Sequence, residues 1–292
     1  MPQWQGRSKG TPLGYRIFIG ILKRWGVSPA YFLLRFVAAY YFLFAWKSNR
    51  LTWYYFRKRL GLGWFPSFFK LYRNYYFFGQ TIIDRVVLMS GIHNKFTFHF
   101  DGEEHLHEIA RNGKGGLLLS AHIGNWEIAG HLLKRLQAPV NIVMFDGEHQ
   151  RLKEYLTSVT GERSANIIVI KEDLSHIYGI IDALSKNELV CMHADRFVED
   201  NKIMEVVFLG KKAKFPSGPF VLATRLNVPV SFVFAMKEKK YHYHFFASEA
   251  KEYTGDDKIL LQQDVLSDFV NGMEKKVKAY PEQWYNYYPF WK

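Results

Sequence analysis

Residues 115–130 read GGLLLSAHIGNWEIAG, a stretch in which a short apolar run leads directly into a histidine. The run Leu117–Leu119 follows two glycines and is typical of a strand that is buried on both faces. Helical periodicity resumes from Trp126, which places His122 at the carboxyl end of the predicted strand. In open α/β sheets ligands bind at this edge, so His122 is a candidate site residue.

An acidic partner for His122 follows five residues later in the sequence. Asn125 is a suitable N-cap for the helix from Trp126, and Glu127 then lies in the first turn, where free N–H groups favour an ionised carboxylate. If Glu127 accepts a hydrogen bond from one ring nitrogen, the other nitrogen can take a proton from a hydroxyl. The stretch therefore predicts a general base, His122, oriented by Glu127; a purely structural histidine is the alternative.

The rest of the chain divides into two kinds of pattern. Residues 11 to about 90 show helical patterns alone, whereas residues 91–292 alternate strand and helix patterns. Such alternation is the signature of a mainly parallel central sheet flanked by helices, so we expect an α/β fold. Since no flexible linker or internal repeat is found, we expect the N-terminal helical region 1–90 and the catalytic domain 91–292 to pack as one unit.

The expected elements follow from hydrophobic period and from glycine and proline punctuation. Strands are predicted at Lys95–Phe100, Leu117–Ala121, Val140–Phe145, Ile167–Ile170, Leu189–Ala194, Glu205–Leu209, Val228–Ala235 and Tyr241–Ala247. Helices are predicted at Leu13–Arg24, Tyr31–Trp46, Leu51–Arg59, Ser67–Leu88, Glu103–Arg111, Trp126–Leu136, Gln150–Val159, Leu174–Ser185, Pro219–Leu226 and Lys258–Lys278.

The composition points to an anionic partner. The net charge of +12 suits a nucleic acid, an acidic carrier protein or a membrane surface. Aromatic residues make up 17% of the chain, more amphipathic ring surface than a soluble core needs, and such rings favour membrane interfaces. We therefore expect an anionic membrane surface as partner and no nucleic acid.

The most apolar segment lies near the N-terminus. Tyr31–Trp46 has 16 residues and contains Arg35, whereas a spanning helix needs about 20 apolar residues. We expect this segment to lie on or dip into a bilayer, with a buried aromatic subdomain as the alternative. A basic cluster that could hold anionic headgroups follows at Lys47, Arg50, Arg57, Lys58 and Arg59. The N-terminus lacks the order of a signal peptide, so export is not expected.

A second set of candidate residues follows the predicted strand Leu189–Ala194. Asp195 and Arg196 come directly after it, at the edge where His122 is expected. Arg196 is a candidate contact for an anion or an oxyanion, and a salt bridge to Asp195 or Glu199 is the alternative.

A cationic stretch then leads into the turn FPSGP, residues 215–219. Ser217 and Gly218 precede a predicted helix whose N-terminal amides, with Lys214 nearby, could bind phosphate or carboxylate. Ordinary loop punctuation is the alternative.

Several chemistries are excluded by the absence of their sequence motifs. The chain contains no P-loop, dinucleotide-binding glycine fingerprint, GxSxG elbow or HExxH motif. Its single cysteine, Cys191, lies in an apolar run and is expected to pack. His193, His122 and Asp195 could be imagined as metal ligands, but we expect neither a metal nor a cofactor. Direct transfer of an already activated acyl group to a hydroxyl is the simplest reaction that remains for a His and Glu pair.

With these residues in place, the chain resembles the bacterial lipid A late acyltransferases, a branch of the lysophospholipid acyltransferase superfamily. HIGNWE, residues 122–127, resembles that branch's form of the His-x4-acid motif. The blocks ADR, FLGKKAKFPSGP and NVPVSFVF follow in the family's order, and the tail YPEQWYNYYPFW resembles its ending. The resemblance covers most of the chain.

The resemblance implies a glycerolipid acyltransferase-like fold, His122 as general base and Glu127 as its orienting partner. It also implies that Arg163 and Arg196 contact anionic substrate, donor or oxyanion, and that Asn125 and Asp195 belong to the substrate site. The donor would be a thioester on acyl carrier protein or coenzyme A, and the acceptor a lipid hydroxyl. By the same resemblance, the protein works at the cytoplasmic face of the bacterial inner membrane.

Two departures from the family bear on the acceptor. The glycerolipid branch usually has an acidic residue at the position of Ser217, which argues against lysophosphatidic acid as acceptor. The Arg-rich end of lipid A enzymes is here Asn286–Pro289, which leaves room for another hydroxylated lysolipid or an aminolipid. A non-catalytic membrane-binding protein on the same scaffold is the rival of another class.

Overall fold

The computed structural model describes residues 12–126, 128, 136, 138–145, 166–171, 173–197 and 202–291. Glu127 and Arg163 lie outside these residues, as do the predicted helix Gln150–Val159 and most of the predicted helix Trp126–Leu136.

The N-terminal part of the described chain is helical, as the sequence predicted. Its elements are α1 (Pro12–Trp25), α2 (Val27–Phe44), α3 (Trp46–Tyr54), the π-helical turn η1 (Tyr55–Arg59) and α4 (Trp64–Met89). The sequence predicted one helix that ends at Trp46 and a second that begins at Leu51, whereas α2 ends at Phe44 and α3 begins at Trp46, so the break falls at Ala45. No glycine or proline marks this break; instead, the Asn49 side chain donates to the Phe42 carbonyl at 2.7 Å and closes the end of α2.

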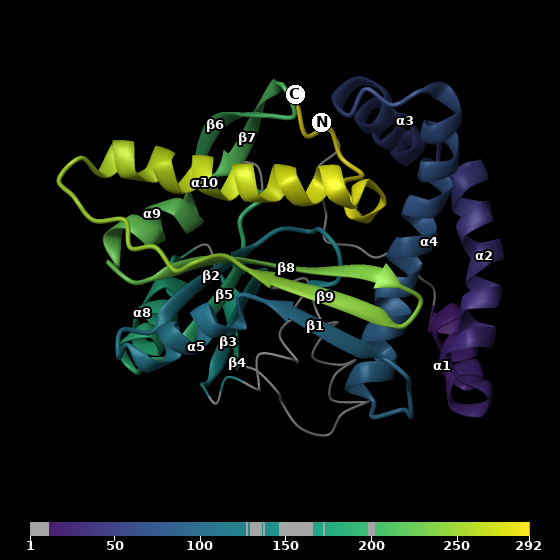
Figure 1. The fold of residues 1–292 in the computed structure, drawn as a ribbon, viewed down its shortest axis with the longest axis horizontal. Coiled ribbons are helices and arrows are strands. Elements are labelled where there is room, and N and C mark those ends of the chain that lie inside the picture. The colour runs from purple at the N-terminus through teal and green to yellow at the C-terminus, as the bar shows by residue number, and fades with distance from the viewer. Residues whose placement is uncertain are drawn as a thin grey trace.

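Helices α1 and α2 pack against the long helix α4, as Figure 1 shows. Their shared core contains Leu22, Tyr31, Leu34 and Val87. The α2–α4 contact is close at Gly79, where a Cβ atom would lie 2.2 Å from a methyl group of Leu34. A larger residue at this position would therefore require the Leu34 side chain to move.

A seven-stranded sheet forms the centre of the described structure, in the order β1-β9-β8-β2-β5-β3-β4. All neighbouring strands are parallel except β8 and β9, which pair antiparallel. The predicted α/β class with a mainly parallel sheet is therefore confirmed. The strands are β1 (Thr97–Asp101), β2 (Gly116–Ser120), β3 (Val140–Phe145), β4 (Asn166–Ile170), β5 (Leu189–His193), β8 (Val230–Lys239) and β9 (His242–Ala247).

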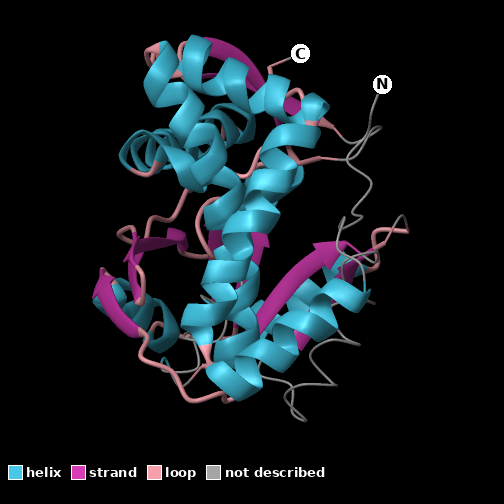
Figure 2. Cartoon of the chain, turned by 90° about the vertical axis from the view of Figure 1, so that its right-hand side faces the viewer, coloured by secondary structure: helices cyan, strands magenta, loops and turns pink. Residues whose placement is uncertain are grey.

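The leucine run of β2 explains how helices cover both faces of the sheet. Leu117 and Leu119 pack with α10 residues, whereas Leu118 packs with α5 residues, because successive side chains of a strand point to opposite faces. All three leucines are completely buried. Figure 2 shows helices and strands layered in this way. The covering helices are α5 (Glu103–Arg111), α8 (His176–Ser185), α9 (Gly218–Arg225) and α10 (Lys258–Ala279), and α10 continues into the 3-10 turn η3 (Pro281–Gln283).

The lysine-rich stretch after the sixth strand is itself a strand, where the sequence predicted no strand and a turn from Phe215. β6 (Ile203–Phe208) and β7 (Lys211–Pro216) form a separate antiparallel hairpin. Ala213 and Phe215 face the core, and the neighbouring lysines hide this alternation. The hairpin turn has positive φ at both central residues, Leu209 (49°) and Gly210 (74°), a geometry usually signalled by Asn-Gly. Leu209, at the first turn position, therefore gave no sequence signal of a hairpin turn.

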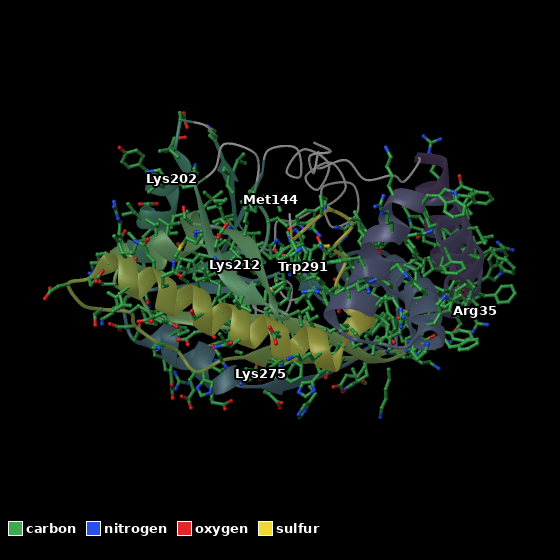
Figure 3. All side chains as sticks on the ribbon, turned by 90° about the horizontal axis from the view of Figure 1, so that it is seen from above. Arg35, Met144, Lys202, Lys212, Lys275 and Trp291 are labelled. Atoms are coloured by element: carbon green, nitrogen blue, oxygen red, sulfur yellow. The ribbon has the colours of Figure 1, made fainter. Side chains whose placement is uncertain are left out.

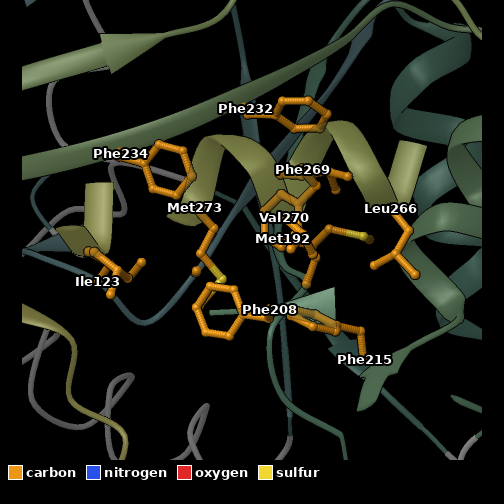
Figure 4. Close-up of a cluster of buried hydrophobic side chains, with 14 of the residues drawn as sticks. Ile123, Met192, Phe208, Phe215, Phe232, Phe234, Leu266, Phe269, Val270 and Met273 are labelled. Atoms are coloured by element: carbon orange, nitrogen blue, oxygen red, sulfur yellow. The ribbon is translucent and has the colours of Figure 1, made fainter. Parts of the chain in front are cut away.

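One large hydrophobic core joins the helical region to the sheet. Figure 4 shows its centre, where Phe208 and Phe215 of the hairpin meet Phe269 and Met273 of α10, with Ile123 beside them. Phe56 and other residues of the N-terminal helices belong to the same cluster. The loop after β2 is therefore held from both parts of the chain.

Candidate active site

His122 and Asp195 form a buried pair at the carboxyl ends of neighbouring parallel strands. The His122 ring donates from Nδ1 to Asp195 Oδ1 at 2.7 Å, and the His122 backbone N–H donates to Asp195 Oδ2 at 3.0 Å. The two residues follow β2 and β5, which pair in register Ser120 to His193. His122 is 5% exposed and Asp195 1%. Parallel pairing thus brings together residues that lie far apart in sequence.

The electrostatics of the pair suit a neutral histidine and an ionised aspartate. Burial and the nearby Arg196 charge lower the pKa of His122, and Asp195 only partly opposes this shift. Although burial alone would raise the pKa of Asp195, its contact with His122 and the Arg196 charge hold it well below its usual range. A neutral imidazole that donates from Nδ1 carries its lone pair on Nε2, so the ring is prepared to accept a proton there.

Two aromatic side chains, His193 and Trp126, pack beside the His122 ring. The His193 ring lies 4.2 Å from the His122 ring, centroid to centroid, and the Trp126 ring lies 5.0 Å from it. Burial and the neighbouring His122 lower the pKa of His193 well below its usual value, so His193 is neutral. The sequence predicted His193 only as a strand residue; its alternation next to Asp195 was the signal that could have placed it beside the site.

The loop that carries His122 is fixed by backbone hydrogen bonds. The N–H groups of Asn125 and Gly124 donate to Ala235 O and Gln283 O, each at 2.8 Å. Gly124 has φ +64°, and a Cβ atom there would lie 2.0 Å from the Ala235 carbonyl oxygen, so no side chain fits. The glycine in HIGNWE therefore allows β8 to approach the loop directly.

The C-terminal tail closes the site from a third side. Arg196 Nη2 donates to the Tyr285 carbonyl at 2.8 Å, and the Tyr288 hydroxyl donates to the Asp195 carbonyl at 3.1 Å. The Tyr285 N–H donates to the His122 carbonyl at 3.3 Å. The sequence marked this tail only by its resemblance to a family, and its density of aromatic residues was the signal of a packing role.

The remaining predicted site residues are placed differently. Asn125 is buried, and its side chain donates to Thr81 O at 3.3 Å and to the Tyr243 hydroxyl at 3.2 Å. Lys214 lies on β7, and Ser217 and Gly218 form the start of α9, so these three belong to the hairpin end of the fold. Figure 3 shows this end at Lys202 and Lys212, far from the helical end marked by Arg35.

A group that could bind a metal ion lies among the described residues at the β1 edge of the sheet. His99, Asp101 and His244 have ligand atoms within 4.8 Å of one another. Two ligand atoms bound to one zinc ion at about 2.0–2.2 Å can lie at most about 4.4 Å apart, which is less than this 4.8 Å. Asp101 also interacts with the Lys276 ammonium, which competes with a cation. The contacts of Asp101 with His99 and His244 join β1 to β9.

Comparison with known proteins identifies the family of this chain. The family model described as bacterial lipid A biosynthesis acyltransferase matches residues 72–292. Two relatives, phosphatidylinositol mannoside acyltransferases of Mycobacterium tuberculosis strains CDC 1551 / Oshkosh and ATCC 25618 / H37Rv, are each 24% identical over 195 residues. The match covers 65% of this chain and 58% of each relative, so the chain spans little more than half of their length. The predicted resemblance is confirmed: the chain belongs to the bacterial lipid A biosynthesis acyltransferase family.

Proposed function

We propose that this protein is a membrane-associated O-acyltransferase that moves a fatty acyl chain from a thioester to a hydroxyl of a lipid acceptor. The donor is an acyl thioester of acyl carrier protein or of coenzyme A. The reaction takes place at the cytoplasmic face of the bacterial inner membrane. The observation that carries the proposal is the buried His122–Asp195 pair at the sheet edge, within a chain of an acyltransferase family.

The proposed reaction is a single direct transfer. Nε2 of His122 takes the proton of the acceptor hydroxyl while the hydroxyl oxygen attacks the thioester carbonyl. The tetrahedral oxyanion collapses and expels the thiolate, which takes the proton back from the imidazolium. Asp195 stabilises that imidazolium by accepting from Nδ1, so no covalent enzyme intermediate is needed.

Anion-binding roles are proposed for several basic residues. Arg196 is held by the Tyr285 carbonyl and lies over the Tyr288 ring, 5.7 Å from its centroid, so its charge is fixed near the reacting pair. Arg163 stays a proposed contact to anionic substrate or donor. Glu127, which the sequence predicted as the orienting partner of His122, stays a proposed catalytic residue, while Asp195 holds Nδ1 in the proposed reaction. Lys214, Ser217 and Gly218 stay proposed contacts to a phosphate or carboxylate group of the substrate.

The pH dependence tests the role of Arg196. Because the base must be neutral, kcat/KM should fall only as the pH drops through the His122 pKa, which lies below 6.5. Arg196→Gln removes a charge that lowers this pKa, so the acidic limb should move to higher pH. Rates measured from pH 4.5 to 9 for wild type and variant check this. An unmoved or more acidic limb would contradict the electrostatic role.

An aromatic surface on the N-terminal helices supports membrane association. Large apolar side chains that are more than half exposed include Phe36, Phe44, Trp46, Trp64, Phe65 and Phe69. Lys47, Arg50 and Lys58 are exposed among them. Rings beside basic residues suit the interface of an anionic bilayer. The helix α2 has 18 residues with mean hydropathy 1.4 and is 28% buried; core helices of soluble proteins and signal sequences also meet this length and composition.

A vesicle experiment tests this docking surface. Trp46→Asp combined with Phe65→Asp should weaken sedimentation with anionic vesicles by about tenfold or more, since each buried ring contributes roughly 1.5–3 kcal/mol. The control is Tyr178→Ser, because Tyr178 is 77% exposed but lies on α8. If the double variant and Tyr178→Ser lost vesicle binding equally, or if the double variant lost none, the docking surface would be refuted.

The acceptor is proposed to be a lipid A precursor or a similar glycolipid. The family model names lipid A and the relatives' names give a phosphatidylinositol mannoside, and both are lipids with sugar hydroxyls. Mass spectrometry of total lipids, with the lipid A fraction included, tests this in cells with and without the protein. A species that gains one acyl mass only with the wild type would identify the acceptor, while a lysolipid or aminolipid product would redirect the assignment.

A further inference from the structure

The His122 loop rests on a buried polar network between the helices and the sheet. Asp84 of α4 accepts hydrogen bonds from Lys237 of β8, from the Tyr243 hydroxyl of β9 and from the Tyr31 hydroxyl of α2. Lys237 also donates to the Tyr31 hydroxyl at 2.8 Å. Asp84 is 0% exposed and Lys237 3%. Four elements thus meet at one ion pair.

This ion pair is costly to bury. Removing two charges from water requires several kcal/mol per ion, and apolar residues of similar volume are often equally or more stable. Burial raises the pKa of Asp84 and lowers that of Lys237, so each charge depends on the other. A gain in overall stability is therefore a weak explanation for the network, whereas its connections point to a positional role.

Two routes lead from the ion pair to the loop. In the first, the Tyr243 hydroxyl donates to Asp84 and accepts from the Asn125 side chain, three residues after His122. In the second, the backbone N–H and carbonyl of Lys237 bond to the Gln283 side chain at 2.9 and 2.7 Å. The backbone carbonyl of Gln283 then accepts a hydrogen bond from the Gly124 N–H. Gly124 and Asn125, which follow His122 in the loop, are thereby both connected to the ion pair.

The network also reaches the helix with the exposed aromatic face. Tyr31 is 3% exposed and points into the network, whereas its neighbour Phe32 is 60% exposed and Phe36 61%. One side of α2 therefore contacts the ion pair and the other side carries part of the docking surface.

We propose that Asp84, Lys237 and Tyr243 are positioning residues that hold the His122 loop in its reactive geometry and link it to α2. In this role the Asn125 side chain connects the loop to Tyr243 by a hydrogen bond and does not contact the substrate. The inference rests on the proposed acyl transfer, because positioning matters only if His122 is the base. A displacement of about 1 Å can cost about 100-fold in rate, so a hydrogen bond remote from the reacting atoms can limit turnover.

A matched pair of tyrosines tests the proposal. Tyr243 and Tyr253 are both buried, at 0% and 3% exposed, and each donates its hydroxyl to an aspartate, Asp84 or Asp268. Tyr243→Phe should lower kcat by about 10- to 100-fold with KM little changed, whereas Tyr253→Phe should retain wild-type kcat. Equal kcat values for both variants, or a loss confined to KM, would overturn the positioning role.

A second readout does not depend on acyl transfer. Imidazole ¹⁵N NMR of the intact protein in nanodiscs, with His122 assigned by its loss in His122→Ala, reports the tautomer and pKa of this ring. Tyr243→Phe should shift the His122 signals and its pKa, and Tyr253→Phe should not. Unchanged signals would overturn the proposal even with an active enzyme. If the wild type transfers no acyl group but the signals shift, the proposed function fails while the coupling stands.

A second variant covers the case in which Tyr243→Phe does not fold. Asp84→Asn combined with Lys237→Met removes both charges together, so neither is left buried alone. The same kcat loss and the same shift of His122 signals are expected. Wild-type values in this variant would overturn the proposal.

Discussion

Replacing His122 by alanine is expected to reduce acyl transfer by about 10⁴-fold, the upper end of the effect of losing a general base. His122 is buried and its Nδ1 is held by Asp195, so no other described side chain takes its position at the end of β2. Turnover is measured with an acyl thioester and lipid acceptor in vesicles, and in cells by the acyl mass gained in total lipids.

The control for this prediction is His99→Ala, because His99 is an exposed histidine at the β1 edge of the sheet. This variant should match the wild type, and His122→Ala should still bind vesicles. Unimpaired turnover in His122→Ala would remove the general base from the mechanism. Identical lipid profiles with and without the wild type would favour a non-catalytic membrane-binding role.

Replacing Asp195 by asparagine is expected to reduce turnover by about 10²–10⁴-fold while vesicle binding is kept. An asparagine amide can donate to Nδ1, which favours the tautomer with its proton on Nε2, and such a ring cannot accept the hydroxyl proton. Asp195 also raises the pKa of His122, so the remaining activity should have its acidic limb at lower pH. The opposite movement is expected for Arg196→Gln.

The comparison variant is Glu127→Ala, for which the sequence predicts a loss of about 10²–10⁴-fold. Single-turnover rates and pH profiles of the two variants separate their roles. A shifted acidic limb in Asp195→Asn alone would identify Asp195 as the partner that sets the His122 pKa. If Asp195→Asn turned over at the wild-type rate, the hydrogen bond at 2.7 Å would have no catalytic role.

Local sequence was sufficient for the sheet and for the position of His122. The run Leu117–Leu119 is apolar because both faces of β2 are covered, and a strand of this kind ends in a predictable place. Asp195 was expected at the same edge for the same reason. The end of the second helix was predicted at Trp46 instead of Phe44, and strand β7 was not predicted, because a side-chain cap and the core-facing residues Ala213 and Phe215 decide them.

The sequence by itself determined which residues stand at strand ends, since hydrophobic period and glycine punctuation are local properties. The tertiary structure decided which of those residues touch: Asp195 contacts His122 because β2 and β5 pair in parallel register. It also brought the tail onto Arg196 and placed Asn125 on Tyr243 and, through it, Asp84. These contacts join residues 73 to 159 positions apart in the sequence. Such pairings depend on packing and hydrogen-bond geometry across the whole fold, which no short window of sequence contains.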